Sequence, residues 1–300
     1  MHEAKSAPIA VSLIVATLGR TQELDRMLAS VASQSFASVD VIVVDQNMDD
    51  RVERVVERWK CRLRCLHVRS PRGLSRARNR GLHLASGAIV GFPDDDCWYP
   101  DDLLLRVNEW FQQHPAHDFL CCAAQDGSGR EVASRWPTHS MEVDRGSVLR
   151  ACASASLFVR RSALDHIGGF DERLGLGAAT PFQSAEDSDV ALRCLQNGRR
   201  GWFEKQLHVY HPDKSAEINS SRAFHYGMGF GCLLRMHGYS ATTLLYHVAR
   251  ALGGAARSTL LAKPEKALFY WESARGRLSG YLHRGPDQMN RIETSVGRHS

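Results

Sequence analysis

The chain has 300 residues, 43% of them hydrophobic and 24% charged, which is ordinary for a globular protein and enough for one large or two modest domains. No apolar run is long enough to span a bilayer, and the first residues lack the apolar core of a secretory signal. The eight cysteines form no CxxC pair, so we expect reduced packing residues rather than a metal finger. We therefore expect a cytoplasmic protein.

The net charge of +5 lies entirely in the last fifth of the chain. Residues 241–300 contain nine Lys or Arg and four Asp or Glu, whereas residues 1–240 contain 29 of each sign. A neutral body with a basic tail indicates that the tail meets something anionic. The tail could lie on an anionic membrane surface, on the inner face of the cell membrane, or pack on the rest of the protein with its basic face in water.

Strands and helices alternate through the first half of the chain. Apolar runs at residues 9–17 and 39–44 predict buried parallel strands, and residues 62–68 are predicted as a third strand. Apolar residues at helical spacing follow each of them. A fourth predicted strand, at residues 88–92, leads into three consecutive aspartates. This alternation predicts an α/β fold with a mostly parallel, doubly wound sheet and right-handed crossovers.

The second half changes character near residue 213. Strands are predicted at residues 118–124, 155–161 and 202–210, irregular chain at 125–150, and a helix from residue 184 to Gly198. From residue 215 onward the sequence predicts helices without strands. We therefore expect one domain at residues 1–212 and a helical extension at residues 213–300.

The aspartates at residues 94–96 follow the end of a predicted strand directly. In open α/β sheets this edge is where ligands bind. Three adjacent carboxylates repel each other unless a positive group lies among them, and Mg²⁺ or Mn²⁺ prefers oxygen ligands. The alternative is a solvated acidic turn, although Asp101 and Asp102 are better placed to cap the helix that follows Pro100.

No glycine-rich GxGxxG or GxxxxGKS loop follows the first predicted strand. The sequence therefore argues against a dinucleotide-binding Rossmann domain, a P-loop and a nucleotidyltransferase. Nucleic-acid binding is not expected either, because the basic residues are not interleaved with stacking aromatics.

Six motifs occur in a fixed order along the chain: ATLGR, VVDQNMDD, GLSRARNRGL, FPDDDCWYP, GGFDERLG and AEDSDVALRCLQNG. Together they resemble the inverting family-two glycosyltransferases, which have the GT-A fold, over about residues 9–212. The resemblance implies a catalytic domain with a nucleotide-binding half at about residues 9–100 and an acceptor half at about 101–212. It also implies a nucleotide-diphospho-sugar donor carrying UDP, GDP or dTDP, and a divalent cation, Mn²⁺ or Mg²⁺.

The resemblance also implies roles for individual residues. The nucleotide-sugar would be bound by Thr17, Arg20, Asp45, Arg78, Asn79, Asp94 and Asp95, and the metal by Asp94, Asp96 and His211. Asp187 would deprotonate the acceptor hydroxyl, with Glu186 as the other choice for this base. An in-line displacement at the anomeric carbon needs such a base on one face and a cation at the departing diphosphate on the other.

Several of these residues have structural alternatives. Ser184 and Asp187 have the spacing of a capping box, so Asp187 could secure a helix start. His211 could be an ordinary residue at a strand end, and Arg20 and Arg78 could be solvated helix residues. Asp45 is followed by Gln46, Asn47 and Met48 instead of the usual acid and small polar residues, so the second nucleoside contact could come from Asp49 or Asp50.

The predicted function is that of a metal-dependent inverting glycosyltransferase, moving a hexosyl or hexosaminyl group to a hydroxyl of a glycan or lipid-linked saccharide, as in cell-envelope polysaccharide synthesis. The alternative is a non-catalytic nucleotide-sugar-binding or scaffold subunit of a glycan-assembly complex. A scaffold has no need of both a metal site and a base, so the acidic motifs favour the enzyme.

Overall fold

A computed structural model describes residues 10–132, 136–213 and 219–283. The chain divides into two compact units, which are treated separately below. The first contains Met1–Glu172 and Glu186–Ala216, and the second contains Arg173–Ala185 and Glu217–Ser300. The predicted domain limits had placed residues 173–185 with the catalytic domain, whereas in the structure this segment belongs to the helical unit.

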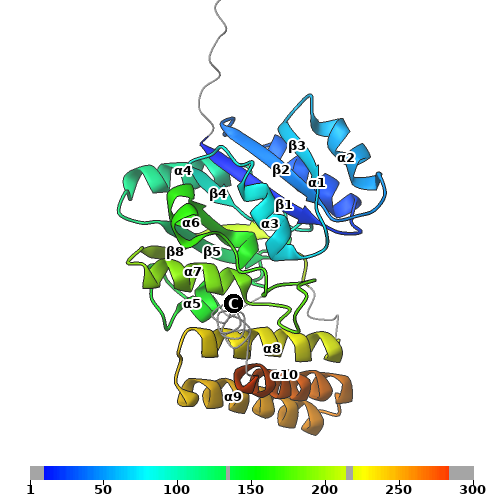
Figure 1. Ribbon diagram of the computed structural model, residues 1–300, viewed down its shortest axis with the longest axis vertical. Helices are drawn as coiled ribbons and strands as arrows, with labels where there is room; N and C mark the ends of the chain where they lie inside the picture. The colour runs from blue at the N-terminus through cyan, green and yellow to red at the C-terminus, as the bar shows by residue number, and fades with distance from the viewer. Residues whose placement is uncertain (1–9, 133–135, 214–218, 284–300) are drawn as a thin grey trace, which may run out of the picture. The chain divides into compact units, whose positions relative to one another are not determined.

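The first unit is built on one eight-stranded sheet with the order β3-β2-β1-β4-β7-β5-β8-β6 (Figure 1). Its strands are β1 (Val11–Thr17), β2 (Val39–Asp45), β3 (Arg64–Arg69), β4 (Ile89–Gly91), β5 (Phe119–Gln125), β6 (Met141–Val143), β7 (Leu157–Arg160) and β8 (Gly201–Tyr210). Strands β1, β2 and β4 are apolar runs as predicted, and most of their side chains are buried. The third predicted strand, β3, lies at the edge of the sheet, and its side chains are exposed or half-buried.

The sheet is mixed, with a parallel block and two antiparallel insertions. Strands β3, β2, β1 and β4 are parallel to their neighbours, and β5 is parallel to β8. Strand β7 lies antiparallel between β4 and β5, and β6 is antiparallel to β8. Because β7 is antiparallel to both of its neighbours, β4 and β5 point the same way. The carboxyl ends of β1, β2, β4 and β8 therefore lie at one edge of the sheet.

Helices of the first unit connect these strands and cover the sheet. They are α1 (Gln22–Ala32), α2 (Arg51–Trp59), α3 (Leu74–Leu82), α4 (Leu103–Gln113), α5 (Val148–Ala151), the 3₁₀ turn η1 (Ser154–Ser156), α6 (Arg161–Ile167) and α7 (Glu186–Gln196). Helix α3 packs on β1 and β2 so closely that a Cβ at Gly81 would lie 2.4 Å from the side chain of Ile14. Residues 125–150, expected to be irregular, contain β6 and α5.

The second unit is helical, as predicted from residue 215 onward. Its helices are α8 (Ser220–Met236), α9 (Ala241–Leu260) and α10 (Pro264–Leu282). A small apolar cluster joins Leu174 and Phe182 of the preceding loop to Met228 and Cys232 of α8. None of the described helices has the length and the apolar character that crossing a membrane requires.

Helices α8 and α10 touch through glycines at four-residue spacing. A Cβ at Gly231 would lie 2.1 Å from the carbonyl oxygen of Arg277, and one at Gly276 would lie 2.1 Å from that of Phe224. Only glycine allows backbones to approach this closely, as in the small-xxx-small pairs of packed helices. Gly227 and Gly280 complete the two pairs.

Candidate active site

The predicted site residues lie at one edge of the sheet because the strands that carry them are parallel. Strand β1 ends at Thr17, β2 at Asp45, and β4 is followed within five residues by the aspartates at 94–96. Strand β8 ends at Tyr210, which places His211 at the same edge. This is the edge at which open α/β sheets bind ligands.

An aromatic clamp holds the aspartate loop against the end of β8. Trp98 and Tyr210 exchange two backbone hydrogen bonds, of 3.0 and 2.8 Å, and their rings stack with centroids 5.4 Å apart. The guanidinium of Arg26 lies over the Trp98 ring and donates to the carbonyl oxygen of Asp96 at 2.8 Å. These contacts bring the residue after β8, His211, beside the aspartates.

Asp94, Asp96 and His211 form a cluster with the donor set of a metal site. One ligand atom from each residue lies within 4.8 Å of the others. The Nδ1 atom of His211 is 2.8 Å from the carbonyl oxygen of Pro212 and therefore carries the proton, because a carbonyl can only accept. The Nε2 atom then faces Asp96 at 3.5 Å and Asp94 at 3.8 Å. This orientation, with the distal ring nitrogen held by a backbone carbonyl, is typical of metal-binding histidines.

The middle aspartate of the motif faces the end of β1. Asp95 accepts a 2.7 Å hydrogen bond from the Thr17 hydroxyl and a 2.5 Å bond from Arg20. Arg20 also lies 2.8 Å from Asp96. Burial raises the pKa of the Asp95 carboxyl, and the Arg20 charge and the Thr17 hydrogen bond offset only part of this rise. Thr17 and Arg20 thus hold the acidic loop in place.

Arg78 connects the acidic loop to helix α7. Its side chain is 1% exposed and lies 2.9 Å from Glu186 and 3.4 Å from Asp94. The guanidinium also lies 5.3 Å from the ring centroid of Phe170. Burial and the neighbouring Asp187 raise the pKa of Glu186 to about 7, against the opposing effect of Arg78. The solvated alternative for Arg78 is therefore wrong.

Asp187 differs from its neighbour in exposure. Glu186 is buried, whereas Asp187 is partly exposed and accepts a hydrogen bond from the backbone N–H of Ser188. Helix α7 begins at Glu186, so Ser184 lies before the cap position, and its hydroxyl donates to the carbonyl oxygen of Tyr226. The capping-box geometry predicted for Ser184 and Asp187 is therefore not formed.

The residue before this acid pair has an unusual backbone. Ala185 has φ of 76°, a left-handed conformation that costs a non-glycine residue roughly 1 kcal/mol or more. Such strain is often found next to functional groups. It directs the chain into α7 with both acids in the first turn, where carboxylates complement the helix dipole.

Asp45 lies apart from the acidic cluster, at the end of β2. It is fully buried, and its carboxylate accepts from the backbone and side chain of Asn47 and lies 3.0 Å from Nε2 of His67. Arg69 lies 3.4 Å from the same carboxylate. Asn47, His67 and Arg69 were not predicted as site residues. For His67 the signal was a polar side chain inside a predicted strand that lies beside the one ending at Asp45.

Asn79 does not contact the acidic cluster among the interactions of the described residues. Its side-chain amide donates to the Phe170 carbonyl and to Glu172, and its oxygen accepts from the Phe170 backbone N–H. Gly169 approaches it so closely that a Cβ would lie 2.7 Å from the Asn79 oxygen. Asn79 thus pins the GGFDER loop, while its neighbour Arg78 faces the acids.

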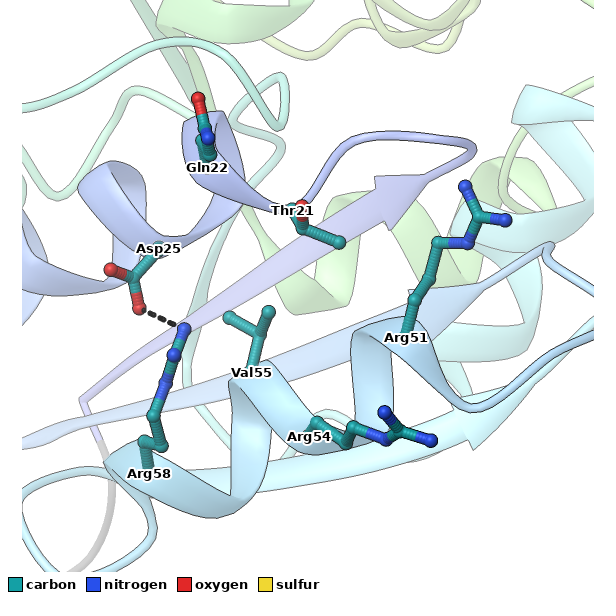
Figure 2. A pocket seen from close by; sticks show the side chains of 7 residues that line it. All are labelled: Thr21, Gln22, Asp25, Arg51, Arg54, Val55 and Arg58. Atoms are coloured by element: carbon teal, nitrogen blue, oxygen red, sulfur yellow. Dashed lines mark hydrogen bonds and ion pairs between the residues drawn. The ribbon is translucent and has the colours of Figure 1, made fainter.

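A groove between α1 and α2 contains none of the predicted site residues (Figure 2). It has a volume of about 390 Å³ and is lined by Thr21, Gln22, Asp25, Arg51, Arg54, Val55 and Arg58. Each of its arginines has an acidic partner: Figure 2 shows Arg58 reaching Asp25, and Arg51 and Arg54 bind Asp49 and Asp50. Asp49 and Asp50, named above as possible nucleoside contacts, are thus engaged by these arginines.

Comparisons with known proteins agree with this architecture. The model of the family "Glycosyl transferase family 2" matches residues 12–168. A "PGL/p-HBAD biosynthesis glycosyltransferase" of Mycobacterium tuberculosis is 26% identical over 62% of this chain and 70% of that protein. The "GalNAc(5)-diNAcBac-PP-undecaprenol beta-1,3-glucosyltransferase" of Campylobacter jejuni is 28% identical over 49% of this chain and 50% of its own length.

Two solved structures share the fold at low sequence identity. Residues 1–349 of TarS from S. aureus, in complex with UDP-GlcNAc, match with a TM-score of 0.57 at 17% identity, over 92% of this chain and 93% of that one. This chain spans 54% of the longer TarS structure. The mannosyltransferase PcManGT from Pyrobaculum calidifontis, in complex with GDP-Man and Mn²⁺, matches with a TM-score of 0.61 at 18% identity, over 93% and 89%. The chain belongs to glycosyl transferase family 2 and is a glycosyltransferase with the GT-A fold.

Proposed function

We propose that this glycosyltransferase is metal-dependent and inverting, and that it moves a sugar from a nucleotide-diphospho-sugar to a hydroxyl of a glycan or lipid-linked saccharide. The observation that carries the proposal is the arrangement of acidic groups. Asp94 and Asp96 share one cluster with His211, while Asp187 lies in the first turn of α7, next to the Glu186 that pairs with the buried Arg78. Metal-binding and proton-accepting groups are thus provided separately, as an in-line displacement requires.

The cluster fits a divalent cation by the chemistry of its donors. The Asp94 and Asp96 carboxylates would repel each other without a positive charge between them, and Nε2 of His211 lies within 3.8 Å of both. Mn²⁺ accepts both oxygen and imidazole ligands. A bound cation would neutralise charge on the diphosphate as it departs. PcManGT was solved with GDP-Man and Mn²⁺, which supports the same class of ligand here.

Asp187 is the better base of the two acids in the first turn of α7. An acceptor hydroxyl must reach the base, and Asp187 is partly exposed whereas the Glu186 side chain is 8% exposed and bound to Arg78. Glu186 would instead orient Arg78, to which it is bound at 2.9 Å.

The donor side is formed by the loops after β1, β2 and β3. TarS binds UDP-GlcNAc and PcManGT binds GDP-Man, so uracil and guanine are the first bases to test. The fully buried Asp45 carboxylate already accepts from Asn47 and lies against His67. We infer that Asn47, His67 and Arg69 meet the base and that Asp45 orients them.

Replacing Asp187 with Asn tests the proposal. We expect the rate of sugar transfer to fall about 10²- to 10⁴-fold, because the amide cannot accept the proton, while nucleotide binding persists. Asp165→Asn, which changes an exposed acid on α6, should leave the rate within about twofold. The anomeric configuration of the product, read by NMR, reports inversion.

Three results would contradict parts of this assignment. Transfer that survives Asp187→Asn but is lost in Glu186→Gln would move the base to Glu186. Retention of the anomeric configuration would exclude the single displacement. Full activity in the presence of a chelator would exclude the metal.

A further inference from the structure

Large apolar side chains are exposed mainly on the last two helices. Of the fifteen exposed large apolar residues in the described part of the chain, nine lie on α9, α10 or the turn between them: Leu245, Tyr246, Leu252, Leu260, Leu261, Leu268, Trp271, Leu278 and Leu282. Single exposed leucines are normal on any protein surface, but a concentration on one pair of packed helices indicates a contact surface.

Helix α9 has two apolar faces. Leu244, Val248 and Ala251 are buried and recur at helical spacing, so they form its packing face. Leu245 and Leu252 lie two turns apart on a different, exposed face. Ala249, between them, and Ala256, one turn after Leu252, are exposed on the same face. The second face is not required for the packing of α9 against its neighbours.

Helix α10 buries small residues and exposes several of its large apolar ones. Ala274, Gly276 and Gly280 are buried, the two glycines in backbone contact with α8. Trp271 is 48% exposed and Leu282 is 69% exposed. Leu268 lies three residues before Trp271, and Leu278 lies four residues before Leu282, so both leucines share the face of these exposed residues. Ordinary amphipathic helices have the reverse arrangement, with large apolar residues packed inward.

Basic residues lie beside the exposed apolar side chains of α9. The guanidinium of Arg250 lies 5.7 Å from the ring centroid of the exposed Tyr246. Arg257 follows two helical turns later on the same side of α9, and both arginines are exposed. From residue 241 to residue 283 the chain has six Lys or Arg and two Glu.

We propose that the exposed face of α9 and α10 docks on the surface of a bilayer that contains anionic phospholipid. Leucine and tryptophan side chains would enter the boundary between headgroups and acyl chains, and Arg250, Arg257, Lys263 and Lys266 would meet the phosphates. The charge of the surface selects this partner, because an apolar protein groove would not require flanking cations. The inference does not depend on the metal or on the base.

Co-sedimentation of the full chain with lipid vesicles tests this docking. Binding is expected to vesicles of phosphatidylcholine and phosphatidylglycerol in equal amounts, weaker to phosphatidylcholine alone, and reduced by salt. Arg250→Glu and Arg257→Glu should each lower the partition coefficient about fivefold or more. Leu252→Glu combined with Leu278→Glu should lower it at least about tenfold.

Two substitutions on the edge strand β3 serve as matched controls. Leu66→Glu changes a leucine of similar exposure, and Arg64→Glu removes an exposed arginine. Both should bind vesicles as the wild type does. Far-UV circular dichroism shows whether any of the variants has lost its helices.

Trp271 supplies an independent readout. Its fluorescence should shift to the blue on vesicle binding and be quenched by brominated acyl chains. Trp271→Phe keeps the apolar surface, so it should still co-sediment but lose that shift.

Three outcomes would overturn the proposal. One is a folded protein that binds neither kind of vesicle. Another is binding that the Arg64→Glu control loses as strongly as Arg250→Glu does, which would indicate general charge attraction. The third is a wild-type protein that binds no vesicles and is a dimer in light scattering, and that becomes a monomer when Leu252→Glu and Leu278→Glu are combined. This result would assign the face to a second copy of the chain.

Discussion

The two units of this protein are stabilised by opposite means. At the edge of the sheet, the first unit pairs charged groups, most of them buried. The buried Arg78 lies between Glu186 and Asp94, and the partly exposed Arg20 lies between the buried Asp95 and Asp96. The second unit buries glycines, whose missing side chains let α8 and α10 touch through their backbones. In one unit a lost charge is costly, and in the other an added methyl group is costly.

The difference shows where specificity of function can reside. Buried ion pairs cost desolvation energy and seldom stabilise a fold more than an apolar core would, so their presence at a ligand-binding edge points to chemistry. Close glycine packing needs no large side chains inside. The leucines and Trp271 of α10 are therefore available to face outward.

Among the substitutions that test stability, Arg78→Ala should destabilise the protein most. It would leave the Glu186 and Asp94 carboxylates without their buried partner, which we expect to lower the free energy of unfolding by about 3–5 kcal/mol. Arg76→Ala, on the same helix, removes an exposed pair with Glu172 and should cost less than about 1 kcal/mol. Urea denaturation measures both. Equal effects would show that burial of the Arg78 pair is not important.

Gly276→Ala should destabilise the second unit. Its new Cβ would lie 2.1 Å from the Phe224 carbonyl oxygen, so α8 and α10 must separate, at a cost of about 1–3 kcal/mol. In the matched variant Gly253→Ala the Cβ meets nothing within 4 Å, and a gain of up to about 1 kcal/mol is expected. Thermal denaturation compares the two. A stabilising Gly276→Ala would contradict the backbone contact.

Glu186→Gln should change the pH dependence of stability in a defined direction. The pKa of Glu186 is raised to about 7 in the folded protein, so its contribution is fully present below the ordinary value of 4.5 and is lost as the pH rises through 7. Between pH 4.5 and pH 7, this group should lower the free energy of unfolding of the wild type by at most about 1.4 kcal/mol per pH unit. The variant should lack that slope. A stability of the wild type that rises through this window because of Glu186 would contradict the raised pKa.

Much of the first unit could be predicted because its signals are local. The apolar runs before Thr17, Asp45 and Asp94 predict buried strands, and parallel order then places their ends at one edge. Strand pairing is not local. Nothing in residues 155–161 indicates that β7 enters antiparallel between β4 and β5, because its paired residues are 36 or more positions away in the chain.

The functional side chains show the same limit. The aspartates at 94–96 and His211 were predicted from motifs, and the structure brings Asp94, Asp96 and His211 together. The partners of Arg78 could not be predicted, since Glu186 is 108 residues away in sequence. The Trp98–Tyr210 clamp and the His67–Asp45 contact depend on the sheet order in the same way.

Isothermal titration calorimetry with UDP, GDP and dTDP, each with and without Mn²⁺, tests the central claim most directly. The account predicts that one of these nucleotides binds, that binding requires Mn²⁺, and that Asp96→Asn abolishes it. Asp101→Asn, an exposed acid five residues further on, should bind as the wild type does. Nucleotide binding that is unchanged by the omission of Mn²⁺ and by Asp96→Asn would contradict the metal site formed by Asp94, Asp96 and His211.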